Sequence, residues 1–219
     1  MKDGSKGYDE IAESLQYPSG GPLTEYLEDL IISGFVEKDD GWSIQTGQEL
    51  RSSKYRIKDN YLRYYLKYIS PHLRKIKKGL FKTTSPFHLP GWEGVLGLQF
   101  ENLVLNNRTA VWQALDIRVE DIVFENPYTQ SKTTKQAGCQ IDYAIQTRFK
   151  NLYLCEVKFS QHPISIDIVR AVEKKVAALK VPKGFACLPI LIHVNGVTQA
   201  VIDSGFFTRI VNFSDAFTQ

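Results

Sequence analysis

Hydrophobic residues recur at helical spacing in two segments near the start of the chain. Ile11, Ala12 and Leu15 fall on one face of residues 9–15. In residues 23–34 the apolar positions follow an i, i+3, i+4, i+7, i+8 pattern, and they are Leu23, Tyr26, Leu27, Leu30 and Ile31. Gly34 stands where a helix is expected to end. The pattern therefore predicts two successive helices.

Residues 35–44 (FVEKDDGWSI) contain two short strand-like runs around an Asp-Asp-Gly turn, which predicts a small hairpin. Helix, turn, helix and hairpin is the order found in a winged helix-turn-helix module, which this segment resembles. We assign residues 1–58 to such a module. It is expected to be truncated, because winged helices normally have one more helix before the first one predicted here.

The stretch from residue 53 to residue 78 is the most basic and aromatic part of the chain. An apolar helical face begins at Tyr61, and Pro71 is expected to end or kink the helix. The proposed nucleic-acid-binding residues are Arg63, Lys67, Arg74, Lys75, Lys77 and Lys78. These residues form either a surface that binds a phosphate backbone or a solvated helix face, and the second is the commoner role of such runs of charge. We assign residues 59–90 to a basic, aromatic helical connector.

Residues 91–219 alternate between helical and strand-like patterns. Helices are predicted at 92–106, with Leu96, Phe100, Leu103 and Val104 facing inward, and at 166–180. Strands are predicted at 122–125, 139–147, 151–159 and 187–196. This order predicts an α/β domain in which helices flank a mixed sheet.

Three charged residues stand out within the predicted strands. Glu156 and Lys158 share one face of strand 151–159, and their neighbours are apolar, so the strand is expected to be central. A charged pair there is costly unless it is paired or binds a metal. Strict alternation places Asp142 on the face of Ala144, opposite to Ile141. A short turn between the two strands then brings Asp142 opposite or diagonal to Glu156.

Two carboxylates beside a lysine suit a hard divalent cation that prefers oxygen ligands. Phosphodiester hydrolysis needs such a cation to polarise the phosphate, and a further positive charge for the developing negative charge. The residues themselves thus point to metal-dependent phosphate chemistry.

An aspartate, 13 intervening residues and then Glu-x-Lys resemble the PD-(D/E)XK nuclease superfamily. The resemblance implies a restriction-endonuclease-like fold in which Asp142 and Glu156 bind Mg²⁺ or Mn²⁺. It also implies that Glu101, from the preceding helix, completes the ligand set and that Lys158 orients or activates the attacking water. Ile141 replaces the proline of the family pattern.

A narrower resemblance is to the C-terminal region of archaeal and bacterial AAA-type ATPases. It rests on Tyr-Arg-Ile-Lys-Asp at 55–59, the Phe-Glu pair at 100–101, Gln-Ile-Asp at 140–142 and Cys-Glu-Val-Lys-Phe at 155–159. No phosphate-binding loop of the GxxxxGK[ST] type occurs, so ATP hydrolysis by this chain is not expected. The resemblance implies a separate ATPase chain as a possible partner, and related nucleases suggest a homodimer.

Composition adds only broad limits. The net charge of +3 permits an anionic partner such as DNA without demanding one. Cys139, Cys155 and Cys187 form no paired motif, which favours reduced thiols in the cytoplasm. No apolar run approaches the ~20 residues of a membrane helix, and no secretory leader is visible.

The four histidines lack the spacing of metal ligands; they are His72, His88, His162 and His193. His162 either reaches a phosphate or lies in a surface loop.

The leading hypothesis from sequence is a Mg²⁺-dependent deoxyribonuclease module. The alternative is a non-catalytic DNA-binding or regulatory module of an ATPase-type protein, and a third possibility is the remnant of a disrupted gene. Glu25, Glu28 and Asp29 make the second helix acidic. That helix is a poor recognition element for phosphates, so a packing or hinge role for the winged helix is at least as plausible.

Overall fold

The computed structural model describes residues 1–18, 20–82, 85–134 and 136–217, and it divides into two compact units. Unit 1 comprises Met1–Asp40 and Ser52–Asn102, and unit 2 comprises Gly41–Arg51 and Leu103–Gln219. Residues 83 and 84 of the predicted connector lie outside the described residues.

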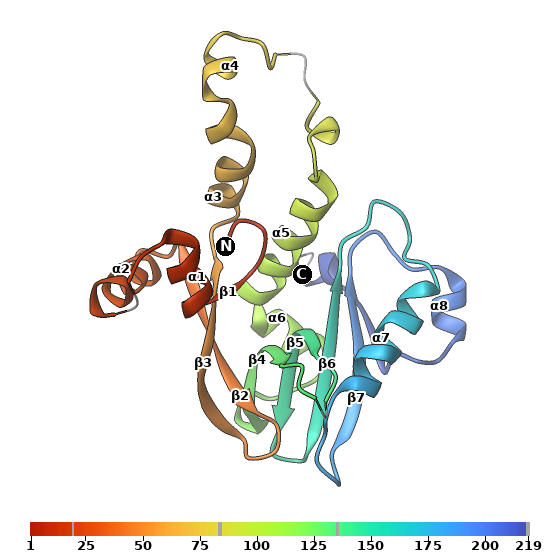
Figure 1. The fold of residues 1–219 in the computed structure, drawn as a ribbon. Coiled ribbons are helices and arrows are strands. Elements are labelled where there is room, and N and C mark those ends of the chain that lie inside the picture. Colours follow the sequence, from red (N-terminus) through yellow and green to blue (C-terminus); the bar gives the residue numbers. More distant parts are fainter. Residues whose placement is uncertain (19, 83–84, 135, 218–219) are drawn as a thin grey trace. The chain divides into compact units, whose positions relative to one another are not determined.

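The elements are labelled in Figure 1 in chain order. In the N-terminal half they are β1 (Lys6–Gly7), α1 (Tyr8–Leu15), α2 (Gly21–Ile32), β2 (Val36–Ser43), β3 (Gln48–Ile57), α3 (Asn60–Tyr64), η1 (Tyr65–Ile69), η2 (Ser70–His72), α4 (Leu73–Lys77) and η3 (Pro86–His88). In the C-terminal half they are α5 (Trp92–Asn106), α6 (Arg108–Ala114), η4 (Val119–Asp121), β4 (Ile122–Gln130), β5 (Cys139–Thr147), β6 (Asn151–Lys158), α7 (Asp167–Ala178), β7 (Ala186–His193), α8 (Gln199–Asp203), β8 (Arg209–Asn212) and η5 (Phe213–Phe217).

Helices α1 and α2 form as the hydrophobic pattern predicts. Leu23 and Leu27 of α2 are buried in one hydrophobic cluster with Ile11 of α1 and Tyr55 of β3. Gly34 adopts φ +76° just after α2, where its missing side chain permits the left-handed conformation. The order of helix, helix and hairpin is present, and the assignment to a winged helix-turn-helix stays a prediction.

The predicted Asp-Asp-Gly turn is wrong. Strand β2 runs straight through Asp39, Asp40 and Gly41, and the chain reverses over residues 44–47 instead. Asp39 is only 4% exposed and is tied into the strand pair by an ion pair with Arg56. The turn uses Gly47, whose φ of +65° suits glycine.

The basic connector folds into consecutive helical segments rather than one regular helix. It begins as α3, widens into the π-helix η1 and tightens into the 3-10 turn η2, which contains Pro71, before α4. Tyr68 is buried and donates a hydrogen bond to the carbonyl of Pro90 at 3.1 Å, while its ring packs against Trp92. These contacts hold the connector against the N-terminal end of α5.

Unit 2 is built on a five-stranded mixed sheet in the order β4-β5-β6-β7-β8. The pairs β4–β5 and β5–β6 are antiparallel, whereas β6–β7 and β7–β8 are parallel. Helix α7 makes the crossover between the parallel strands β6 and β7 and lies beside them in Figure 1. The predicted mixed sheet flanked by helices is therefore confirmed.

Helix α7 covers one face of this sheet with an apolar stripe. Its residues Ile168, Val169 and Val172 form a hydrophobic cluster with Leu191 of β7. On α5, the expectation that Leu103 faces inward is wrong, because its side chain is 39% exposed whereas the adjacent Asn102 is only 2% exposed.

Within the described part of the chain, no helix has the length and apolar character that crossing a membrane requires. The three cysteines are free thiols. Burial raises the pKa of each of them, so they are poor nucleophiles.

Candidate functional site

A β-bulge lies at Asp142 and Tyr143 of β5. Between Asn126 and Tyr128 strand β4 advances by two residues, while their partners on β5, Ala144 and Ile141, are three apart. The extra residue breaks the strict alternation of β5, and Ile141 and Ala144 consequently lie in the same hydrophobic cluster. The sequence pattern had placed these two residues on opposite faces.

Strands β5 and β6 form the expected antiparallel hairpin. The register pairs Tyr143 with Cys155 and Ala144 with Leu154, so Asp142 and Glu156 both lie directly beside the first of these pairs. At this point the Asp142 side chain takes part in the strand pairing, because its Oδ2 accepts a hydrogen bond from the Val157 backbone N–H at 2.9 Å. This bond fixes the carboxylate beside β6.

Lys175 of α7 connects the two carboxylates. Its Nζ forms a hydrogen-bonded ion pair with Oε2 of Glu156 and lies 3.8 Å from Oδ1 of Asp142. The side chains of Asp142 and Glu156 are 15% and 10% exposed, and that of Lys175 is 30% exposed. Two largely buried acidic groups thus converge on one ammonium group.

Burial dominates the electrostatics of this cluster. Desolvation, followed by the charge of Glu156, raises the pKa of Asp142 from 3.8 to about 6, against the opposing effects of Lys175, the Val157 N–H and Lys158. Burial by itself lowers the pKa of Lys175, but the charges of Asp142 and Glu156 outweigh it, so that pKa is raised. Asp142 therefore changes protonation closer to neutrality than an ordinary aspartate.

Lys158 lies at the end of β6 and is exposed. Its charge contributes to the environment of Asp142, since it lowers the pKa of that carboxyl. In the parallel register it stands beside His193 of β7, which is 5% exposed and whose Nδ1 has no hydrogen-bond partner among the described residues. Burial lowers the pKa of His193, which favours the neutral imidazole. His162 is exposed in the loop after β6, which agrees with the prediction that it lies in a surface loop.

Glu101 belongs to unit 1, whereas the other predicted catalytic residues belong to unit 2. It is partly buried on α5, and its charge raises the pKa of Arg63 against a larger lowering by burial. Among the described residues, no group of three or more His, Cys, Asp or Glu side chains is arranged to hold a metal ion. The structure brings Asp142 and Glu156 together, and the membership of Glu101 in this set stays a prediction.

Arg63 is unsuited to the role proposed for it. It is 2% exposed, and its guanidinium donates hydrogen bonds to backbone carbonyls, including that of Ile57 at 3.1 Å. Its place on the inner side of α3 makes it a structural residue rather than a phosphate contact. Lys67 forms an ion pair with Asp3.

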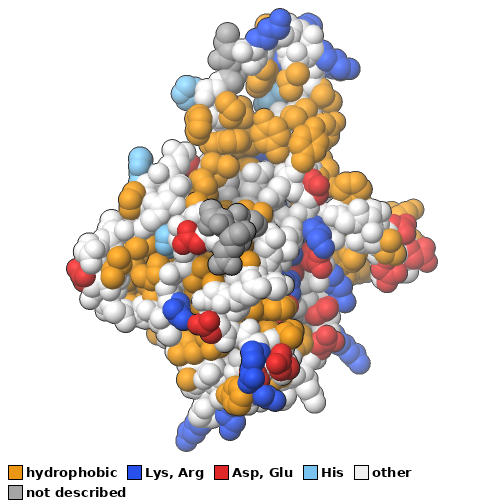
Figure 2. Space-filling model, turned by 180° about the vertical axis from the view of Figure 1, so that it is seen from behind, with side chains coloured by type: hydrophobic (Ala, Val, Ile, Leu, Met, Phe, Trp, Pro, Cys, Tyr) orange, Lys and Arg blue, Asp and Glu red, His pale blue; other side chains and the backbone are white. Residues whose placement is uncertain are grey.

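The four remaining basic residues of this set are all exposed on or just after α4; they are Arg74, Lys75, Lys77 and Lys78. Figure 2 shows blue side chains gathered at the end of this helical segment, above a band of hydrophobic side chains. The structure thus concentrates the available positive charge of the connector at α4.

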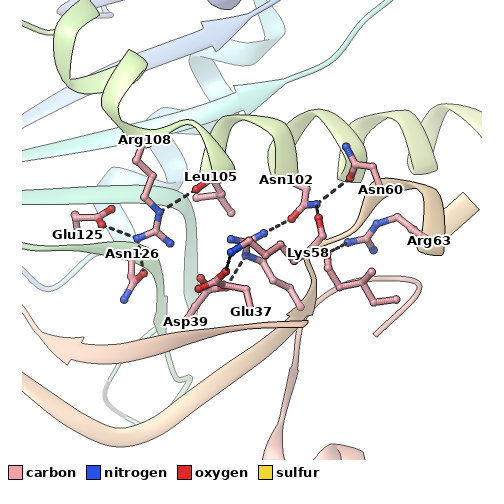
Figure 3. Close-up of polar contacts among 12 residues, drawn as sticks. Glu37, Asp39, Lys58, Asn60, Arg63, Asn102, Leu105, Arg108, Glu125 and Asn126 are labelled. Atoms are coloured by element: carbon pink, nitrogen blue, oxygen red, sulfur yellow. Dashed lines mark hydrogen bonds and ion pairs between the residues drawn. The ribbon is translucent and has the colours of Figure 1, made fainter. Parts of the chain in front are cut away.

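A buried polar network in unit 1 joins the hairpin to α5 (Figure 3). Arg56 donates to Oδ2 of Asp39 at 3.0 Å and also to Oδ1 of Asn102. The Asn102 amide in turn donates to the Lys58 carbonyl and, at 2.9 Å, to Oδ1 of Asn60. This network explains why a polar residue takes the inward position beside Leu103.

Unit 2 contains a second polar network, which involves α6, β4 and Tyr143 of β5. Arg108 pairs with Glu125 at 2.6 Å and donates to Asn126 at 3.0 Å (Figure 3), while the Trp112 indole donates to the Tyr143 hydroxyl at 2.8 Å. Burial raises the pKa of Tyr143, so its hydroxyl stays protonated. We assign this network to packing of α6 on the sheet.

Lys175 is the member of the cluster that sequence reasoning missed. The available signal was its position seven residues after Ile168 and three after Val172, which places a lysine at the edge of the apolar stripe of α7. A lysine so placed needs a partner of opposite charge. No comparable signal marked His193 within its apolar strand.

Comparisons with known proteins add limited information. No protein-family model matches the chain. A segment of 59 residues, 27% of this chain, is 37% identical to an uncharacterized protein of Methanocaldococcus jannaschii, of whose length the match spans 13%. A repair endonuclease from Pyrococcus abyssi is similar in structure with a TM-score of 0.34 and 16% identity, over 51% of this chain and 43% of that chain. A likeness at that level assigns neither fold nor activity to this chain.

Proposed function

We propose that this chain is a nuclease-like module that hydrolyses DNA phosphodiester bonds with Mg²⁺ or Mn²⁺. The observation that supports the proposal is the convergence of Asp142 and Glu156, two largely buried carboxylates from adjacent strands, with Lys158 two residues beyond Glu156. A protein bears the cost of burying like charges side by side when they serve a function. The resemblance of these residues to the PD-(D/E)XK pattern points to the same chemistry.

The donor set fits a hard divalent cation. Oδ1 of Asp142 and Oε2 of Glu156 both face the ammonium group of Lys175, which supports the proposal that the two carboxylates can share one bound cation. Carboxylate oxygens are the ligands that Mg²⁺ and Mn²⁺ prefer. Such a cation, when bound, would supply Lewis acidity toward a phosphate oxygen and lower the pKa of a water molecule.

The residues of the chain have separable roles in this proposal. Asp142 and Glu156 hold the cation, and the Val157 N–H orients the Asp142 carboxylate through its 2.9 Å hydrogen bond. Lys158, exposed at the strand end, positions the attacking water or compensates charge that develops on the phosphate. Glu101 is proposed as a further ligand by resemblance alone.

The test is cleavage of plasmid, linear and branched DNA with Mg²⁺ or Mn²⁺. We expect Asp142→Asn, Glu156→Gln and Lys158→Met each to reduce cutting by at least about a hundredfold, as loss of an electrostatic catalytic group usually does. Lys174→Met is the matched control, since Lys174 is an exposed lysine on α7 next to the cluster in sequence. Cutting that survives in all three site variants would exclude this site as its source.

A second candidate function is a non-catalytic DNA-binding or regulatory module of an ATPase-type protein. The observation that favours it is the ion pair of Lys175, because the acidic pair already has a cationic partner within the chain. In this case DNA binding depends on the exposed residues Arg74, Lys75, Lys77 and Lys78 and not on a divalent ion. DNA binding that is equal with Mg²⁺ and with a chelator, without any cutting, would favour this function over hydrolysis.

A further inference from the structure

We infer that Lys175 is a resident counter-ion of the acidic pair, which a divalent cation must displace in order to bind. The inference rests on the proposed function, since it concerns the same two carboxylates. It adds a residue, from the helix α7, that none of the sequence patterns assigns to the site.

The geometry supports this role directly. The Lys175 Nζ is paired with Oε2 of Glu156 and lies 3.8 Å from Oδ1 of Asp142, so its charge occupies the space toward which both carboxylates point. An ammonium group and a divalent cation cannot share that space without strong repulsion. The two positive charges are therefore alternatives.

The Lys175 side chain is exposed enough for its ammonium group to move into solvent. Its carboxylate partners are 15% and 10% exposed, whereas the Lys175 side chain is 30% exposed. A lysine has a flexible four-carbon stem, so its ammonium group can swing to solvent while the backbone of α7 stays packed through Val172. The apolar stripe of the helix thus fixes the base of the side chain and leaves its end movable.

The exchange makes a definite prediction about affinity. Without metal, the charge of Lys175 offsets part of the repulsion between Asp142 and Glu156 and stabilises the two carboxylates in the folded chain. With metal, the ion pair must break first, which weakens divalent binding relative to a site without the lysine. Lys175 is accordingly a competing counter-ion that lowers metal affinity, so occupancy of the site requires a higher free metal concentration.

The test measures Mn²⁺ binding to the full chain by isothermal titration and by electron paramagnetic resonance, without DNA. We expect Lys175→Met and Lys175→Gln to lower the Kd by at least about tenfold, because removal of a unit charge next to the ion removes its repulsion. Lys175→Arg, which keeps the charge, should bind Mn²⁺ no more tightly than the unchanged chain. Lys174→Met should leave the Kd unchanged, although it alters the net charge equally.

The outcomes separate this inference from the proposed function. Equal Kd values for the unchanged chain and the Lys175 variants would overturn the inference and leave the metal site in place. Weaker binding in Lys175→Met and Lys175→Gln, with far-UV circular dichroism unchanged, would also overturn it, because the lysine would then organise the ligands. Absence of Mn²⁺ binding in the unchanged chain and in every Lys175 variant would overturn both proposals.

Discussion

At the scale of single residues, the acidic pair shows how burial shifts the protonation of an ordinary side chain. Asp142 has a pKa of about 6 because burial, and then the charge of Glu156, disfavours its ionised form. Lys175 and the Val157 N–H offset only part of that cost. The cluster is therefore close to a change of protonation at neutral pH, and ligand binding there requires the ionised form of Asp142.

The raised pKa of Asp142 predicts a pH-dependent loss of stability. Between pH 3.8 and about 6 the folded chain retains a proton that the unfolded chain releases, so the free energy of unfolding falls as the pH rises through this window. The loss is on the order of a few kcal/mol, since each pKa unit corresponds to about 1.4 kcal/mol. Denaturant unfolding at several pH values, without metal, should show this fall in the unchanged chain and a smaller one in Asp142→Asn. Parallel profiles for the two proteins would contradict the assignment.

At the scale of elements, polar contacts decide orientations that hydrophobic patterns leave open. The helix at 92–106 was predicted with its observed bounds, yet its buried face includes Asn102 in place of Leu103. Arg56 needs the amide oxygen of Asn102, because a buried guanidinium without its full set of acceptors is costly. For Asp142 of β5 the Val157 N–H plays the corresponding part, because the carboxylate accepts its hydrogen bond.

Asn102→Ala is expected to lower the free energy of unfolding by about 2 kcal/mol, since it removes one acceptor from Arg56 and one donor from the Lys58 carbonyl. The control is Glu93→Ala at an exposed position of the same helix, where a change within about 0.5 kcal/mol is expected. Urea denaturation followed by circular dichroism measures both. A similar loss in the two variants would show that the network contributes nothing specific.

At the scale of the whole molecule, the features that point to DNA are divided between the two units. The exposed basic residues of α4 belong to unit 1 and the acidic pair belongs to unit 2. The net charge of +3 is too small to attract DNA strongly by itself. Affinity for DNA should therefore depend on the local cluster at α4.

Replacing Arg74, Lys75, Lys77 and Lys78 by Gln should weaken DNA binding and flatten its dependence on salt. If these residues contact phosphates, the slope of log K against log salt should fall in magnitude by about two to four, since each neutralised phosphate contributes about 0.9. The matched control replaces four exposed lysines elsewhere, namely Lys132, Lys174, Lys180 and Lys183, for the same change in charge. Equal effects of the two quadruple variants, measured by fluorescence anisotropy, would assign the change to net charge alone.

The sequence by itself determined β5, β6 and α7 of unit 2 and the proximity of two charged residues. Alternating and helical hydrophobic patterns reflect burial of one face, so they located β5, β6 and α7 to within two residues, and the short turn after Thr147 imposed antiparallel pairing. The two carboxylates face each other because that pairing is local. The same periodicity did not show that Arg63, which was proposed to bind nucleic acid, would be buried.

Only the tertiary structure decided the partners that come from distant segments. Lys175 reaches Glu156 and Asp142 because α7 folds back over the sheet, and a bulge in β5, invisible in the periodicity, puts Ile141 in the same hydrophobic cluster as Ala144. The turn at Gly47, the inward Asn102 and the buried Arg63 depend likewise on long-range polar contacts. Hydrophobic periodicity records which face of an element is buried, but the pairing of buried polar groups depends on which elements meet, and that is a property of the folded chain.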